Sequence, residues 1–315
     1  MDGILNINKP SGITSFGVVA LVRRLSGERR VGHAGTLDPA ATGVLPVCLG
    51  QGTRVIEYLV DTTKSYRAEI ELGVTTDTYD AEGKVTGQAD HSGISRAQLD
   101  SALDSFRGQI EQVPPIYSAL KHQGKPLYEM ARAGLNVELK SRPVTIHKLE
   151  LIDFQLPAVT IEVVCSKGTY IRSIAHDLGQ ILGCGAHLKS LIRLRCGIFD
   201  IKDAVSMPQL EEVFRDGRWQ QFIYPIDSVL SDLPSVEVSD DEAKNIRNGR
   251  ALLLERGRIG AVSNNLPPSI SDEASVQKQC RAYNVDGSFL AVLRFNPEDG
   301  QWYPQKVFSQ SGAYL

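Results

Sequence analysis

The chain has 315 residues, of which 42% are hydrophobic and 23% are charged, and its formal net charge is −3 at pH 7. This mixture is typical of a soluble globular protein, and the length suggests two domains, or one large domain with an appendage. No apolar run is long enough to span a membrane, and no signal peptide is recognisable, so we expect a cytoplasmic protein.

The small net charge conceals strong segregation along the chain. Residues 117–148 carry six Lys or Arg against two acids, and residues 165–202 again carry six against two, whereas residues 203–243 carry ten acids and two Arg. Clustered basic residues attract phosphate groups, although most charged runs are simply solvated surface. The two basic segments therefore make nucleic-acid binding a hypothesis that stands beside the simpler interpretation.

The chemistry-bearing residues exclude several classes of site. The five cysteines include no Cys-x-x-Cys pair, which indicates reduced thiols rather than a disulfide framework. His176, Cys184, His187 and Cys196 lie within a short span, but only Cys184 and His187 have the close spacing of zinc ligands. No phosphate-binding glycine motif is present. We therefore expect neither a metal nor a nucleotide cofactor.

Hydrophobic periodicity and turn residues predict the elements in chain order. The predicted strands are 3–8, 44–49, 66–72, 144–154, 158–165 and 289–295, and the predicted helices are 14–24, 53–59, 95–106, 126–133, 171–182 and 188–194. Because strands follow one another directly instead of alternating with helices, the pattern favours an α+β fold with a mixed, mostly antiparallel sheet. A separate β-rich unit is expected from about residue 236.

The segment from Gly32 to Pro46 is the most informative stretch of the chain. It contains three glycines, two prolines and one carboxylate, Asp38, which Pro39 restricts to an extended or turn conformation. A carboxylate on such a rigid loop suits a catalytic role. The simpler interpretation is that Asp38 caps a helix in a surface turn, and the composition of the loop alone favours that interpretation.

Four blocks of sequence carry a resemblance to a known family. They are 8–15 together with 32–46, then 64–68, 115–121 and 165–172. In this order and with these separations, they closely resemble the bacterial tRNA pseudouridine-55 synthases of the TruB family. Ala40 departs from the Leu that the family more often carries after the Asp-Pro pair.

The resemblance implies a role for each of eight residues. Asp38 would be the essential catalytic carboxylate, Arg172 would pair with it, and Tyr66 would stack on the uracil and handle a proton. Tyr170, Leu191, His33, Lys9 and Asp80 would belong to the substrate site, with Lys9 supporting the loop and His33 filling the space left by the flipped base. The pattern alone favours a core tyrosine at Tyr66, because Tyr66 shares a strand face with Ile70 and Leu72.

The resemblance also implies the domain plan and the partners. Residues 1–230 would form the catalytic domain with a central cleft flanked by helices, residues 109–142 an arm over the RNA, and residues 236–315 a small PUA-like RNA-binding domain. The substrate would be the T-arm stem-loop of tRNA, with no cofactor and no membrane partner, and the protein would act as a monomer and also assist tRNA folding.

Two other functions remain open on the sequence alone. A non-catalytic RNA-binding or RNA-folding protein would use the basic segments and leave Asp38 incidental. A glycosidase of other substrates would need a second carboxylate on a similarly marked loop, which the sequence does not offer. The isomerisation of uridine requires no redox centre or metal because it is an internal rearrangement, and this agrees with the motifs that are present.

Overall fold

The computed structural model describes residues 1–118, 120–122, 124–133, 137, 139–260 and 278–309. Over these residues the central feature is an 11-stranded mixed sheet, whose main path runs β14-β1-β3-β12-β4-β11-β10-β7. The bounds along this path are Val205–Ser206, Gly3–Lys9, Thr42–Leu49, Ala186–Cys196, Lys64–Leu72, Ala158–Cys165, Arg142–Gln155 and Gly108–Gln112. Only the β1–β14 and β3–β12 pairs of this path are parallel, so the predicted mostly antiparallel sheet is confirmed.

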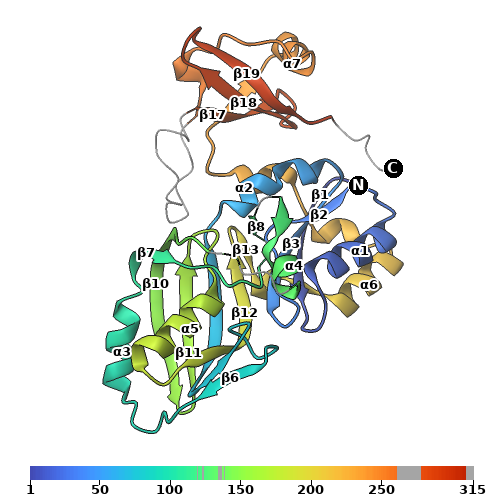
Figure 1. Cartoon of the computed structure of the whole chain (residues 1–315). Helices are drawn as coiled ribbons and strands as arrows, with labels where there is room; N and C mark the ends of the chain where they lie inside the picture. Colours follow the sequence, from blue (N-terminus) through green and yellow to red (C-terminus); the bar gives the residue numbers. More distant parts are fainter. Residues whose placement is uncertain (119, 123, 134–136, 138, 261–277, 310–315) are drawn as a thin grey trace.

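Helices cover the sheet in two separate groups (Figure 1). Helices α3 (Arg96–Asp104) and α5 (Ile171–Leu182) pack with β4, β10 and β11 in one hydrophobic cluster. Helices α1 (Ser15–Ser26) and α6 (Met207–Arg215) pack with β1 and β3 in a second cluster. Tyr66 and Leu191 contact both clusters, so they lie where the two halves of the domain meet.

The predicted helix over 188–194 is wrong, because these residues belong to the central strand β12. Two register shifts, between Leu188 and Ser190 and between Arg193 and Arg195, interrupt the alternation of buried and exposed side chains. A strand with two bulges loses the period of two that identifies a strand in sequence. The prediction therefore failed where a long-range sheet position decides the conformation.

The remaining elements of the large domain are short. They are β2 (Val31–His33), η1 (Gly50–Val55), α2 (Ile56–Val60), β5 (Val74–Thr76), β6 (Val85–Gln88), β8 (Lys121–His122), β9 (Lys125–Pro126), α4 (Leu127–Arg132), β13 (Phe199–Asp200), η2 (Ile201–Asp203), η3 (Trp219–Phe222), β15 (Ile223–Tyr224) and η4 (Ile226–Leu230). None of the helices in the described part of the chain combines the length and apolar character that crossing a bilayer requires.

The C-terminal unit is a second, smaller sheet in the order β16-β17-β18-β19, accompanied by α7 (Asp240–Arg247) and η5 (Arg256–Arg258). Its strands are Ser235–Val238, Gln279–Asn284, Phe289–Asn296 and Gln301–Val307. The expected β-rich C-terminal unit is thus present, at the top of Figure 1.

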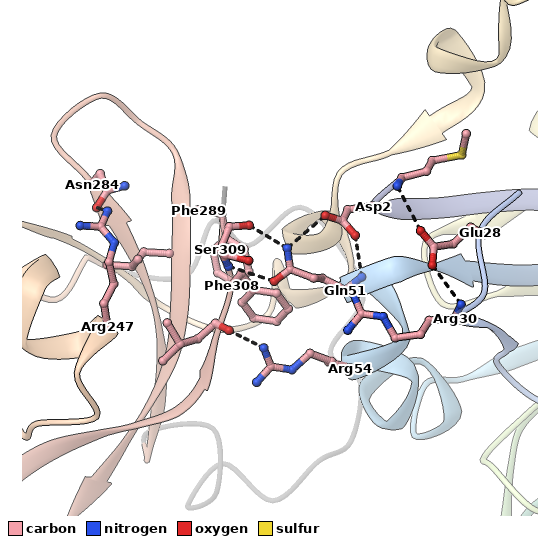
Figure 2. A pocket seen from close by; sticks show the side chains of 13 residues that line it. Asp2, Glu28, Arg30, Gln51, Arg54, Arg247, Asn284, Phe289, Phe308 and Ser309 are labelled. Carbon is pink, nitrogen blue, oxygen red and sulfur yellow. Dashed lines mark hydrogen bonds and ion pairs between the residues drawn. The ribbon is translucent and has the colours of Figure 1, made fainter. Parts of the chain in front are cut away.

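The residues that follow β19 contact the large domain and hold the C-terminal unit against it (Figure 2). The side-chain amide of Gln51 donates to the carbonyl of Ser309 at 2.7 Å and accepts from its amide at 2.9 Å. Asp2 accepts from Gln51 on the other side. Phe308 is buried in a cluster that includes Leu59 of α2. A cavity of about 760 Å³ lies between the two units at this junction.

All five cysteines are buried and carry free thiols, in agreement with the expected reduced state. Cys48, Cys165 and Cys196 belong to the large sheet, Cys184 follows α5, and Cys280 lies in β17 of the C-terminal unit. Burial raises the pKa of Cys48, Cys165 and Cys280 to about 12, which keeps these thiols protonated at neutral pH.

Candidate active site

A cavity of about 880 Å³ opens between the two halves of the large domain, where Tyr66 and Leu191 meet. Seven of the eight residues that the sequence singled out line it: His33, Asp38, Tyr66, Asp80, Tyr170, Arg172 and Leu191. These residues come from β2, the loop before β3, β4, the loop after β5, the start of α5 and β12. The fold therefore brings together side chains that are separated by up to 158 positions in the sequence.

Backbone clamps on both sides fix the loop that carries Asp38. Before it, the buried hydroxyl of Ser15 donates to the Leu37 carbonyl at 3.0 Å and accepts from the Leu37 amide at 2.9 Å. After it, the carbonyl of Pro39 accepts from the amide of Gly12 at 2.9 Å and from the ammonium of Lys9 at 3.0 Å. No described helix begins between residues 27 and 49, so Asp38 does not act as a helix cap.

The carboxylate of Asp38 instead pairs with Arg172. The Nε atom of Arg172 lies 3.1 Å from Oδ2 of Asp38, and its Nη1 atom lies 3.3 Å from Oδ2 of Asp80. The Arg172 side chain is only 7% exposed, and its Nη2 atom also donates to the carbonyl of Tyr117 at 2.9 Å. One guanidinium is thereby held between two carboxylates and the backbone, which fixes its orientation.

Asp80 is itself held in a tight turn. Its Oδ1 atom accepts from the Thr78 hydroxyl at 2.5 Å and from the Glu82 amide at 3.1 Å, which leaves Oδ2 facing Arg172. Asp80 lines the cavity, but every bond of its carboxylate described here orients Arg172 or the turn. Its position therefore supports the Asp38–Arg172 pair more directly than it supports contact with a substrate.

Burial raises the pKa of Asp38 above its ordinary value, and the negative charge of Asp80 raises it further. The charges of Arg172 and Lys9 lower it, as expected from the pair, but the effect of burial is larger. The Asp38 side chain is 42% exposed, yet this exposure opens into the cavity and not onto a flat surface. Arg172 therefore offsets part of the cost of burying the carboxylate without removing it.

Tyr66 is the third residue of β4, and its side chain lines the cavity. Burial raises the pKa of its phenol to about 12, although the nearby guanidinium of Arg193 lowers it. The phenol is consequently neutral at physiological pH. Leu191 lies two residues before Arg193 on β12 and adds an apolar wall beside Tyr66.

Tyr170 is positioned by its backbone at the start of α5. The side chain of Gln112 accepts from the Tyr170 amide at 2.7 Å and donates to its carbonyl at 3.0 Å. Gln112 is only 3% exposed, so this contact is shielded from water. The clamp aims the ring of Tyr170 into the cavity, where burial raises the pKa of the phenol.

His33 and Lys9 differ in their relation to the cavity. His33 lines it, burial and the charge of Arg193 lower its pKa, and its buried Nδ1 atom has no hydrogen-bond partner among the described residues. Lys9 is fully buried and lies outside the cavity wall. Its ammonium donates to the carbonyls of Pro10, Ile13 and Pro39 at 3.0, 2.7 and 3.0 Å, which places it as a support of the loop.

Sequence reasoning missed three basic residues of the cavity, the buried Arg193 and Lys64 and the exposed Lys167. Arg193 is 1% exposed and donates to the carbonyls of Val44 at 2.7 Å and Gly35 at 3.1 Å. A side chain on Gly43 would lie 2.3 Å from the Arg193 carbonyl, so only glycine permits this close approach. The available signal was a charge inside the apolar run 191–194, a pattern that rarely belongs to a solvated face.

Within the described residues, no group of three or more His, Cys, Asp or Glu side chains could hold a metal ion. His187 contacts the carbonyl of Val74 at 3.1 Å, and the ring of His176 stacks on Tyr79 at 3.8 Å. Cys184 and Cys196 are buried in hydrophobic clusters. The side chains of the expected arm residues Lys121, Lys125 and Arg132 lie outside the described part of the chain.

Family models match most of this domain. The model of the TruB family pseudouridylate synthase N-terminal domain matches residues 23–171, and that of the tRNA pseudouridylate synthase B C-terminal domain matches residues 172–231. The chain is similar to tRNA pseudouridine synthase B of Dehalococcoides mccartyi, with 44% identity over 98% of this chain and 97% of the relative. It is also 48% identical to that of Symbiobacterium thermophilum, over 80% of this chain and 83% of the relative.

Solved structures share the fold at lower identity. A Cbf5-Nop10-Gar1 complex contains a chain that superposes with a TM-score of 0.71 and 24% identity, over 98% of this chain and 84% of that one. An H/ACA RNP bound to a substrate RNA containing 2′-deoxyuridine gives 0.70 and 23%, over 98% and 85%. At these identities the likeness describes the architecture of both units.

Proposed function

Because the chain belongs to the TruB family of pseudouridylate synthases, we propose that it isomerises uridine 55 in the T-arm loop of tRNA to pseudouridine. The observation that carries this proposal is the Asp38–Arg172 pair, held 3.1 Å apart on a doubly clamped loop inside a cavity of about 880 Å³. The tRNA substrate follows from the relatives at 44–48% identity, which are named tRNA pseudouridine synthase B.

The cavity suits a base that has been flipped out of the RNA. Enzymes that act on a base inside a folded nucleic acid extrude it and hold it between flat or apolar side chains. Tyr66 and Leu191 supply such a surface on one side, and Tyr170 supplies a ring from the start of α5. His33 would fill the space that the base vacates in the RNA.

Asp38 would carry the chemistry. The bond between N1 of uracil and C1′ of the ribose breaks, the base turns within the cavity, and C5 forms a new bond to the same C1′. A carboxylate can act as the nucleophile at the sugar or stabilise its positive character, as in other reactions of glycosidic bonds. Burial raises the pKa of Asp38, so the negative charge of this carboxylate is poorly solvated in the free enzyme. Positive charge that develops on the sugar would then interact strongly with the carboxylate.

Tyr66 would stack on the uracil and relay a proton late in the reaction. Because its pKa is raised to about 12, the phenol cannot begin as a base at neutral pH. Its hydroxyl can instead accept a proton while it passes its own to a neighbour. Arg172 and Asp80 would orient Asp38, and Lys9 would hold the loop that carries it.

The proposal extends to the other parts of the chain. Residues 1–230 would perform catalysis on a tRNA that also contacts the arm at about 109–142, and residues 236–315 would bind RNA as a PUA-like domain. The protein would act as a monomer in the cytoplasm, without a cofactor. Assistance with tRNA folding is compatible with this activity, because both need the same RNA surface.

The direct test uses the full-length chain and a synthetic T-arm hairpin that carries a 5-tritiated uridine at the target position. We expect tritium release in proportion to pseudouridine formation, since C5 loses its hydrogen when it bonds to C1′. A matched hairpin with the tritiated uridine at another loop position should release none. If the chain binds the hairpin tightly but releases no tritium, the non-catalytic RNA-binding function replaces this proposal.

A further inference from the structure

Three basic side chains are buried in this region, and we call them the buried basic cluster: Lys9 and Arg193 bond the loop that carries Asp38, and Lys64 lines the cavity with Arg193. The exposed fractions of Lys9, Lys64 and Arg193 are 0%, 6% and 1%. Among the described residues none of the three forms an ion pair with a carboxylate within 4.0 Å. Buried charges in proteins are ordinarily paired with an opposite charge. Three buried basic side chains without a carboxylate partner therefore require an explanation.

Backbone carbonyls accept from all three basic side chains, and Arg193 also hydrogen-bonds the neutral phenol of Tyr66. Lys9 donates to the carbonyls of 10, 13 and 39, Lys64 to those of 59, 60 and 62, and Arg193 to those of 35 and 44. Carbonyl oxygens satisfy the N–H donors and fix the orientation of each group, but they carry no net charge. The cluster is therefore rigid and still positive.

The members of the cluster also destabilise one another's charge. Burial lowers the pKa of Lys9 to about 8 and lowers that of Lys64, and the charge of Arg193 acts in the same direction on both. The same charge lowers the pKa of His33. Since arginine keeps its proton in proteins, Arg193 is the permanent charge of the group. The fold thus retains an electrostatic cost that a neutral side chain at 193 would avoid.

The position of Arg193 relates this charge to the proposed binding surface. Arg193 on β12 lies directly opposite Tyr66 on the neighbouring strand β4. The guanidinium of Arg193 lowers the pKa of the Tyr66 phenol. Both Arg193 and Lys64 line the cavity. Arg172, by contrast, is neutralised by Asp38 and Asp80. The uncompensated positive charge therefore lies on the side of the cavity where the base would stack.

The reaction generates a matching negative charge. When the N1–C1′ bond breaks, its electron pair remains on N1, so the base becomes a uracil anion while the sugar becomes electron-deficient opposite Asp38. The anion then forms the C5–C1′ bond with its own electron pair, C5 releases its proton and N1 takes one up, which leaves the same atoms in the product. The negative charge on the base exists only after bond cleavage has begun.

We propose that Arg193, with Lys64 beside it on the cavity wall, stabilises the uracil anion that forms between cleavage of the old bond and formation of the new one. A fixed charge aimed at a developing charge lowers the barrier without needing to reorganise, and it favours the transition state over the neutral bound base. This inference rests on the proposed function, because it requires a uracil that leaves the sugar.

The test compares two variants and two leaving bases in single-turnover reactions of the full-length chain. The T-arm hairpin carries either uridine or 5-fluorouridine at the target position, and fluorine makes the departing base a more stable anion. Consumption of the target nucleoside is followed by mass spectrometry after nuclease digestion. Removing one fixed stabilising donor costs roughly 10²–10³-fold in comparable sites.

We expect Arg193→Gln to slow the uridine reaction by about a hundredfold or more and the 5-fluorouridine reaction by about tenfold or less. Arg193→Lys, which keeps the charge, should remain within about tenfold of the parent with both bases. Arg195→Gln is the matched control, because Arg195 is exposed on the same strand outside the cavity, and it should change neither rate.

Equal losses with both bases in Arg193→Gln would show a merely structural role and overturn the inference. A loss of hairpin affinity with an unchanged single-turnover rate would also overturn it, because the cluster would then serve an RNA phosphate. If Arg193→Gln does not fold, as judged by its thermal transition, Arg193→Lys decides alone: near-parental rates support the inference, and equal losses of a hundredfold or more reject it. A parent chain that fails to convert uridine refutes the proposed function instead.

Discussion

Two cavities of this molecule, of about 760 and 880 Å³, differ in how deeply the cations around them are buried. At the junction with the C-terminal unit, the amino group of Met1 pairs with Glu28, and Asp2 accepts from Gln51 (Figure 2). Arg54, which is half-buried, donates to the carbonyl of Val307, and Arg247, which is exposed, donates to the side-chain oxygen of Asn284. Around the candidate active site, Arg172 balances two carboxylates, while Lys9, Lys64 and Arg193 are buried and have no carboxylate within 4.0 Å among the described residues.

The difference separates a site built for stability from a site built for chemistry. A junction gains most when each polar group meets its complement, because an unsatisfied group costs stability. A catalytic site can retain unbalanced charge when the missing partner arrives with the reaction. Substitutions in the catalytic cavity should therefore change rates, and substitutions at the junction should change the free energy of unfolding.

The largest expected effect comes from Asp38→Asn, which should abolish conversion while it leaves affinity for the T-arm hairpin nearly unchanged. The amide keeps the shape of the side chain but loses the charge and the nucleophilic oxygen. Tritium release and a binding titration measure the two quantities. Asp61→Asn serves as the control, because Asp61 is an exposed acid that pairs with Lys167 at the rim. Substantial turnover in Asp38→Asn would remove Asp38 from the chemistry.

At the junction, Phe308→Ala should lower the free energy of unfolding by about 3–5 kcal/mol, since Phe308 is 3% exposed in a cluster shared by both units. Chemical denaturation measures this change. The single-turnover rate should stay within about threefold of the parent, because Phe308 does not line the cavity that contains Asp38. Leu253→Ala, at a residue that is 80% exposed, should change stability by at most about 0.5 kcal/mol. A hundredfold loss of rate in Phe308→Ala would contradict the division between the two cavities.

Tyr66→Phe should keep RNA binding and stability but slow chemistry by on the order of a hundredfold, the usual contribution of a proton-transferring group. Tyr66→Leu should in addition weaken capture of the base, because stacking contributes roughly 1–3 kcal/mol per base. Single-turnover rates and hairpin titrations separate the two effects, with the exposed Tyr303→Phe as the control. A normal rate in Tyr66→Phe would leave Tyr66 a stacking role only.

The smallest effect is a shift in pH dependence. The reaction needs the Asp38 carboxylate, so its rate should fall as the pH drops through a pKa that burial has raised above the ordinary carboxyl range. Asp80 raises that pKa, and Asp80→Asn should therefore move the acid limb of the single-turnover profile to lower pH. A shift to higher pH would indicate that loss of the Arg172 contact outweighs the loss of the Asp80 charge.

Local signals in the sequence predicted the elements that depend on local interactions. The strand expected at 66–72 is β4 at Lys64–Leu72, and the helix expected at 171–182 has these bounds in the structure. The capping box at Ser95 and Gln98 is formed as its spacing predicts. Strand β12 was mistaken for a helix because its bulges hide its period, and its conformation depends on β3 and β4 on either side.

The site was predictable to the extent that a motif marks it. Asp38 is conspicuous because proline and glycine restrict its loop, and the resemblance then supplied Arg172 and the cavity residues. The clamps by Ser15 and Gln112 were not predictable, since each joins segments that only the tertiary fold brings together. Arg193 was missed for the same reason: its burial beside Gly43 depends on the parallel pairing of β12 with β3.

The buried cysteines give the chain a built-in reporter of local opening. A thiol that is shielded from solvent and has a pKa raised to about 12 reacts with a soluble alkylating reagent only while the surrounding structure is transiently open. Cys280 would report such events in the C-terminal sheet, and Cys48 and Cys165 those in the large sheet. The alkylation rate of each cysteine, measured by mass spectrometry of its peptide, therefore gives the frequency of local opening in each sheet separately, with and without bound RNA.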